Sequence, residues 1–161
     1  MWRTIGQSAA AGVIATLSMD VLSAAAYKLR VTAPLPPNLV GRWFAAVARA
    51  HPFHADIATA PSVPHEIALA LPVHYAIGMT LTAFYVWTAF RLGLPARHFG
   101  LALSFGLATN VLPWLLMFPA MGYGWFGAHG PVGTRLFASS LFSHACFGLG
   151  IWIAMRVIAT S

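Results

Sequence analysis

Long apolar segments separated by polar connections are the main pattern along this 161-residue chain. A membrane-spanning helix needs about 20 consecutive, predominantly apolar residues. Four segments reach that length, at about 5–27, 67–90, 99–121 and 136–157. The pattern therefore predicts an all-α integral membrane protein, a four-helix bundle that forms a single transmembrane domain over residues 1–161.

The connections between these segments differ in character. The first, over 28–66, is long and rich in proline, so it cannot form one helix. Within it, residues 38–50 place apolar side chains at helical spacing, which predicts a short helix lying in the membrane interface. The third, over 122–134, is rich in glycine and predicts a flexible loop covering a site. The first apolar segment also resembles a cleaved signal peptide, but Asp20 near its end favours a retained helix.

Composition narrows the class further. Hydrophobic residues make up 59% of the chain, charged residues 7%, and the mean hydropathy is +0.75. A soluble domain has about a quarter of its residues charged. The net charge of +6 comes as much from the scarcity of acidic residues as from the nine arginines and lysines. These bases are spread over the connections, which fits contact with lipid headgroups and argues against a nucleic-acid partner. Membrane lipids are the expected partners, together with a second copy of the chain or another membrane protein.

Three ionisable residues inside the apolar segments are the main functional signal. Asp20 lies seven residues before the end of the first segment, His74 seven after the start of the second, and His144 eight after the start of the fourth. At 1.5 Å per residue, all three lie ~10–12 Å below the same membrane face. Ionisable groups at membrane depth are costly and mark functional sites. We therefore expect these side chains to converge inside the bundle.

Other polar residues are expected near this site. Four of them lie at segment ends or in the first connection, near the membrane face that is closest to Asp20, His74 and His144. They would surround the mouth of the site and are Glu66, Arg135, Arg42 and His54. Asn110 lies deeper, near the middle of the third segment. Each has a structural alternative, such as a favourable helix-end charge for Glu66 or headgroup anchoring for the arginines.

A set of motifs covers nearly the whole chain. They are Gly12-x-x-Ala15-Thr16-x-x-Met19-Asp20, Gly41-Arg42-Trp43, His54-x-x-Ile57-x-x-Ala60-Pro61-x-Val63-x-x-Glu66, His74-Tyr75-Ala76-Ile77-Gly78, Pro113-x-x-x-Met117-x-Pro119-Ala120-x-Gly122, Arg135 and His144-x-x-Phe147-Gly148-x-Gly150. With these motifs the chain resembles the bacterial membrane-protein family called domain of unknown function 2938. It departs from the family pattern at Phe118, where that pattern has glutamine. The resemblance implies a small bacterial inner-membrane protein and supplies no mechanism.

The compact basic turn with Arg91 and Arg97 favours both termini in the cytoplasm.

Several functions fit these residues. The favoured hypothesis is a site that binds or transports a proton, a metal ion or a small solute, with Asp20, His74 and His144 as the candidate metal ligands. Alternatively, the two histidines are axial ligands of a haem or chlorophyll-type cofactor. A membrane enzyme on a lipid-soluble substrate is less favoured, because no serine or cysteine nucleophile stands beside a histidine in a known signature. A non-catalytic assembly subunit also remains open.

Overall fold

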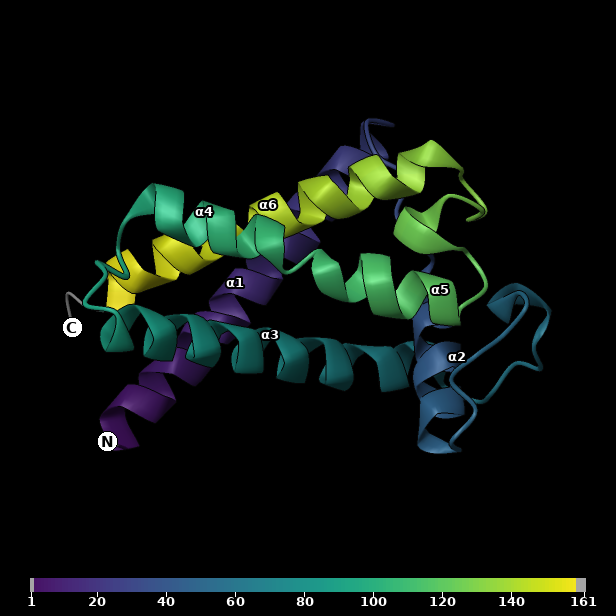
Figure 1. Cartoon of the computed structure of the whole chain (residues 1–161), viewed down its shortest axis with the longest axis horizontal. Helices are drawn as coiled ribbons and strands as arrows, with labels where there is room; N and C mark the ends of the chain where they lie inside the picture. The colour runs from purple at the N-terminus through teal and green to yellow at the C-terminus, as the bar shows by residue number, and fades with distance from the viewer. Residues whose placement is uncertain (1, 159–161) are drawn as a thin grey trace. The chain divides into compact units, whose positions relative to one another are not determined.

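Every regular element in the described part of the chain is helical. The computed structural model describes residues 2–158, and side chains from residue 6 onward. The α-helices are α1 (Trp2–Lys28), α2 (Pro37–Ala48), α3 (Glu66–Arg91), α4 (Phe99–Ala108), α5 (Phe118–Ala120) and α6 (Thr134–Val157) (Figure 1). Single 3-10 turns lie at Ile57–Thr59 and Trp125–Gly127, and a π-helical turn covers Pro113–Met117. The predicted all-α class is confirmed.

Four helical segments within the described residues are long and apolar enough to cross a membrane. They are Gly6–Lys28, Glu66–Arg91, Phe99–Ala120 and Thr134–Val157. Their ends agree with the predicted spans to within two residues. The helix expected in the first connection is present as α2, with Pro37 in its first turn, where a missing N–H costs nothing. Its position in the membrane interface remains a prediction.

The third span differs from the continuous helix that the sequence predicts, because it is interrupted in its middle. α4 ends at Ala108, and Thr109 and Asn110 form a turn before the helical path resumes. The Thr109 hydroxyl donates to the Gly106 carbonyl at 2.6 Å. Pro113 follows the turn and has no backbone N–H to continue the ladder of hydrogen bonds. The chain then forms the π-helical turn, whose end is marked by a bond from the Phe118 N–H to the Pro113 carbonyl.

The described chain divides into two compact units. Within the described residues, unit 1 comprises 2–25, 74–109 and 141–158, and unit 2 comprises 26–73 and 110–140. The division passes through α1, α3 and α6 and through the interruption in the third span. Each unit has its own cluster of buried apolar side chains.

Unit 1 is built on close helix contacts at small residues. Gly12 of α1 lies against the backbone of Met79 in α3, and Gly150 of α6 lies against Ala15 of α1. Gly106 of α4 likewise meets the backbone of α6. Lipid tails are as apolar as leucine, so helices in a membrane associate through such close packing rather than through a hydrophobic driving force.

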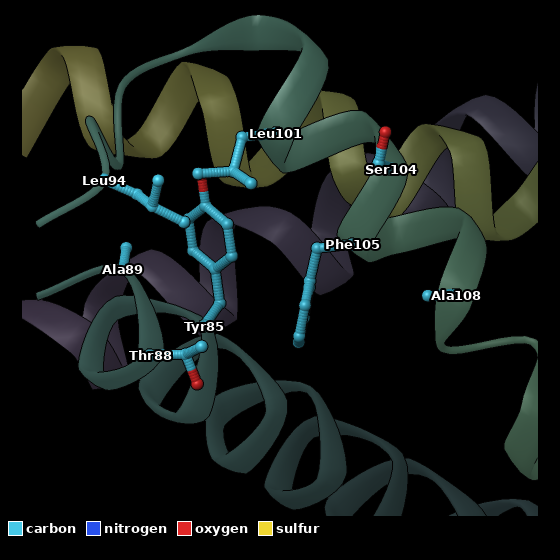
Figure 2. Close-up of a pocket in the computed structure, with 8 residues that line it drawn as sticks. All are labelled: Tyr85, Thr88, Ala89, Leu94, Leu101, Ser104, Phe105 and Ala108. Carbon is cyan, nitrogen blue, oxygen red and sulfur yellow. The ribbon is translucent and has the colours of Figure 1, made fainter. Parts of the chain in front are cut away.

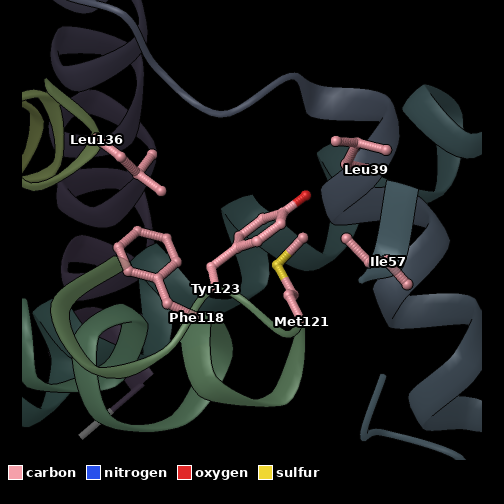
Figure 3. Close-up of a cluster of buried hydrophobic side chains, with 6 residues drawn as sticks. All are labelled: Leu39, Ile57, Phe118, Met121, Tyr123 and Leu136. Carbon is pink, nitrogen blue, oxygen red and sulfur yellow. The ribbon is translucent and has the colours of Figure 1, made fainter. Parts of the chain in front are cut away.

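Unit 2 joins the first and third connections. The backbone N–H of His54 donates to the Ala120 carbonyl at 2.8 Å, and that of Ile57 donates to the Met121 carbonyl at 2.9 Å. Around these bonds lies a buried cluster that combines residues from α2, both connections, α5 and α6. Its members are Leu39, Ile57, Phe118, Met121, Tyr123 and Leu136, whose side chains face a common interior (Figure 3). The glycine-rich third connection is therefore packed over its first half rather than loose.

An arginine–carboxylate pair closes the first connection of unit 2. Arg42 Nε lies 2.7 Å from Glu66 Oε1, and the two side chains are only 12% and 9% exposed. Arg42 Nη1 also donates to the carbonyls of Ala60 at 2.9 Å and Ala58 at 3.1 Å, and the backbone N–H of Val63 donates to Glu66 at 3.0 Å. The hydrogen bond to Glu66 raises the pKa of Arg42. One ion pair thus ties α2, the loop and the start of α3 together.

The close contact at Gly106 predicts a stability effect. A Cβ at Gly106 would overlap backbone atoms of Gly148 and His144, which cannot rotate aside. We expect Gly106→Ala to destabilise the protein by about 1–3 kcal/mol, the usual cost of overpacking, measured as a fall in Tm in detergent. Gly6, which has no neighbour within 4 Å of such a Cβ, supplies the control: Gly6→Ala should leave Tm unchanged or slightly raised. Equal effects of the two substitutions would contradict the close contact.

The Arg42–Glu66 pair predicts a local effect on the first connection. Arg42→Gln removes the charge and leaves the Glu66 carboxylate without its partner, so we expect cleavage within residues 51–65 by an added protease to accelerate on the order of tenfold. The control is Arg49→Gln, on the exposed residue that follows α2, which should cleave at the wild-type rate. Wild-type resistance of the Arg42 variant would show that the pair does not hold the loop.

Candidate functional site

Asp20 and His74 form the central contact of unit 1. His74 Nε2 of α3 lies 3.1 Å from Asp20 Oδ1 of α1, and the two side chains are 34% and 37% exposed. The Tyr75 hydroxyl interacts with the same carboxylate. The contact lies inside two segments that are apolar enough to span a membrane. The pair is therefore a polar contact between α1 and α3 that combines a carboxylate with an imidazole, which carries hydrogen-bonding groups on both ring nitrogens.

His144 of α6 belongs to the same unit and has a defined ring orientation. Its Nδ1 lies 2.7 Å from the Thr109 hydroxyl, and the ring also interacts with the Gly106 carbonyl and, electrostatically, with His74. A carbonyl oxygen can only accept, and the Thr109 proton is already given to Gly106. We infer that Nδ1 of His144 donates the proton in this contact. In the neutral ring, Nε2 then holds the lone pair.

A further polar contact joins α1 and α6. Ser23 Oγ lies 2.8 Å from Ser143 Oγ. Ser23 is three residues after Asp20 and so lies on the same side of α1, and Ser143 directly precedes His144. Unit 1 therefore contains polar contacts between α1 and α3 and between α1 and α6.

The predicted residues of unit 2 are engaged separately. Arg42 and Glu66 use their side-chain polar atoms in the contacts that close the first connection. The Ser140 hydroxyl donates to Asn110 Oδ1 at 2.8 Å, and Asn110 is fully buried. Arg135 Nη2 donates to the Arg30 carbonyl at 3.3 Å. Among the described residues, the His54 ring offers a buried Nε2 with no hydrogen-bond partner.

The structure thus brings the predicted residues into local groups. Asp20, His74 and His144 are associated within unit 1, whereas Arg42 and Glu66 pair within unit 2. Sequence reasoning missed the partners that hold these residues, namely Ser23, Tyr75, Thr109, Ser140 and Ser143. All five had a usable signal, because each is adjacent to a selected residue or about one helical turn from it.

The structure gives no support to the predicted metal set of His74, His144 and Asp20. Within residues 2–158, no group of three or more histidine, cysteine, aspartate or glutamate side chains is placed to hold a metal ion. His74 directs Nε2 at Asp20, and His144 directs Nδ1 at Thr109. Both imidazoles are therefore engaged in hydrogen bonds within the protein.

Comparison with known proteins supplies a family. No curated protein and no solved structure matches the chain. A family model described as "Protein of unknown function (DUF2938)" matches residues 9–158. That range includes all the candidate site residues of both units and covers nearly the whole chain, so the protein is a member of the DUF2938 family.

Proposed function

We propose that this protein binds a proton inside a bacterial inner membrane and passes it, or a small solute coupled to it, through unit 1. The observation that carries the proposal is the 3.1 Å contact between Asp20 and His74 within two apolar spans. Such a pair is expensive to place in a membrane, and ionisable residues there mark proton relays and ion paths. A merely structural link could be made by uncharged side chains at lower cost, as Ser23 and Ser143 show.

His144 gives the proton a second position. Its Nδ1 is held by Thr109 and Gly106, so proton exchange takes place at Nε2. The rings of His74 and His144 lie close enough to interact electrostatically. A proton that arrives at the Asp20–His74 pair would therefore have His144 as a second position.

The interrupted third span supports the same function. Non-helical backbone at membrane depth is tolerated where it is buried in protein or lines a cavity, and discontinuous helices form the binding sites of many transporters. Here the turn at Thr109 is held directly by His144.

The orientation of the chain is part of the proposal. The basic turn at Arg91 and Arg97, which joins α3 to α4, favours the cytoplasmic side. Both termini would then lie in the cytoplasm, on the same side of the membrane as this turn.

Proton flux tests the proposal. Vesicles containing the wild-type protein and a trapped pH-sensitive dye should dissipate an imposed pH gradient faster than empty vesicles. Asp20→Asn and His74→Gln should each reduce this extra flux by at least about tenfold, because a positioned acid–base group contributes about 10²–10⁴-fold to proton transfer. His51→Gln, a change of an exposed histidine outside the spans, is the control. Wild-type vesicles as tight as empty ones would reject proton transport.

The tautomer of His144 is a separate prediction. In nitrogen-15 spectra of the histidine side chains at neutral pH, His144 should show a protonated Nδ1 and an unprotonated Nε2. Thr109→Val removes the hydroxyl that accepts from Nδ1 and should increase the share of the other tautomer, while the His74 signals change little. Observation of a protonated Nε2 in the wild-type protein would contradict the assigned orientation.

A further inference from the structure

A cavity between α3 and α4 of unit 1 lies outside the site described above. It has a volume of about 240 Å³. One wall is formed by Tyr85 and Ala89 of α3, and the other by Leu101 and Phe105 of α4 (Figure 2). The rings of Tyr85 and Phe105 lie with their centroids 5.1 Å apart.

The shape of the cavity fits one end of a hydrocarbon chain. Its lining is almost entirely apolar, and its volume of about 240 Å³ is large enough for several methylene groups. It extends from Leu94, in the turn between the two helices, to Ala108 at the end of α4. Leu101 and Ala108 are separated by about 10 Å along the helix axis. An acyl chain entering beside the turn would therefore run along α4.

Charge at the turn selects the kind of lipid. Arg91 ends α3, two residues after the lining residue Ala89, and Arg97 precedes α4, three residues after Leu94. Both are exposed. The Arg91 guanidinium lies 5.8 Å from the centre of the Trp87 ring, as is typical of cationic and aromatic residues at a membrane interface. Every phospholipid tail gains about the same from the cavity, so the preference for one lipid must come from the headgroup. Two guanidinium groups favour an anionic phosphate.

We propose that the cavity between α3 and α4 is a binding site for an anionic phospholipid, with one acyl chain along Tyr85, Leu101 and Phe105 and the phosphate at Arg91 and Arg97. The site is independent of the proton function, because it uses none of the residues of the Asp20–His74 contact. It differs from general surface attraction in requiring both the cavity and the charges of the turn.

Competition between two lipids tests this site. The full-length protein, purified in mild detergent, is mixed with equal amounts of phosphatidylglycerol and phosphatidylcholine that carry the same acyl chains, and bound lipid is counted by native mass spectrometry. The wild-type protein should retain one phosphatidylglycerol in preference to phosphatidylcholine. The double substitution Arg91→Gln and Arg97→Gln should lower that preference about tenfold. Arg156→Gln, which removes a cation elsewhere in unit 1, should preserve it. Equal loss with Arg156→Gln would overturn the site in favour of unspecific charge attraction.

A second pair of variants tests the cavity itself. Ala108→Phe places a ring at an exposed lining position and should reduce phosphatidylglycerol retention several-fold while Tm stays near the wild-type value. Ala83→Phe introduces the same ring at an exposed alanine of α3 that does not line the cavity, and should have no effect. Full retention in the Ala108 variant, or no preference for the anionic lipid in the wild-type protein, would overturn the proposal.

Discussion

The structure depends on the rule that polar groups inside an apolar medium must find their partners within the protein. No water is available in a bilayer core, so each unsatisfied backbone or side-chain group costs several kcal/mol. Asp20 is the most demanding case, since a carboxylate in the first span needs both a donor and close neighbouring helices. His74 of α3 supplies the polar partner of the Asp20 carboxylate. The glycine and alanine contacts of unit 1 let the helix backbones approach closely.

The same rule explains why the interruption in the third span and the polar residues of α6 occur together. Thr109, Asn110 and Pro113 disturb the regular hydrogen bonding of the helix, and the disturbed region needs side chains that can bond to it. Ser140 and His144 are four residues apart and therefore lie on one side of α6. Ser140 bonds to Asn110 and His144 bonds to Thr109. The histidine is consequently held at Nδ1 by the interrupted segment.

The spans were predictable because their lengths follow from hydropathy alone, and the association of Asp20 with His74 followed from their equal depth. Depth does not give the rotation of a helix about its axis, so the Thr109 and Gly106 contacts of His144 could not be derived from spacing. The pairing of Arg42 with Glu66 was also beyond the pattern. It depends on how the proline-rich connection folds back and on Gly41, whose missing side chain leaves room for the Glu66 carbonyl. The interruption at Thr109 had only Pro113 as a signal, and prolines are common inside membrane helices.

The charged residues fall into two kinds, and the difference indicates where chemistry can occur. Arg42 directs its guanidinium at Glu66 and at backbone carbonyls, which fixes a loop and leaves little capacity for a ligand. Asp20 and His74 make fewer contacts, keep about a third of their surface exposed, and lie where an ionised group is hardest to stabilise. A protein that needed only a link between α1 and α3 could use hydroxyl groups, as α1 and α6 do. The presence of a titratable pair at greater cost is therefore the feature on which the proposed proton function rests.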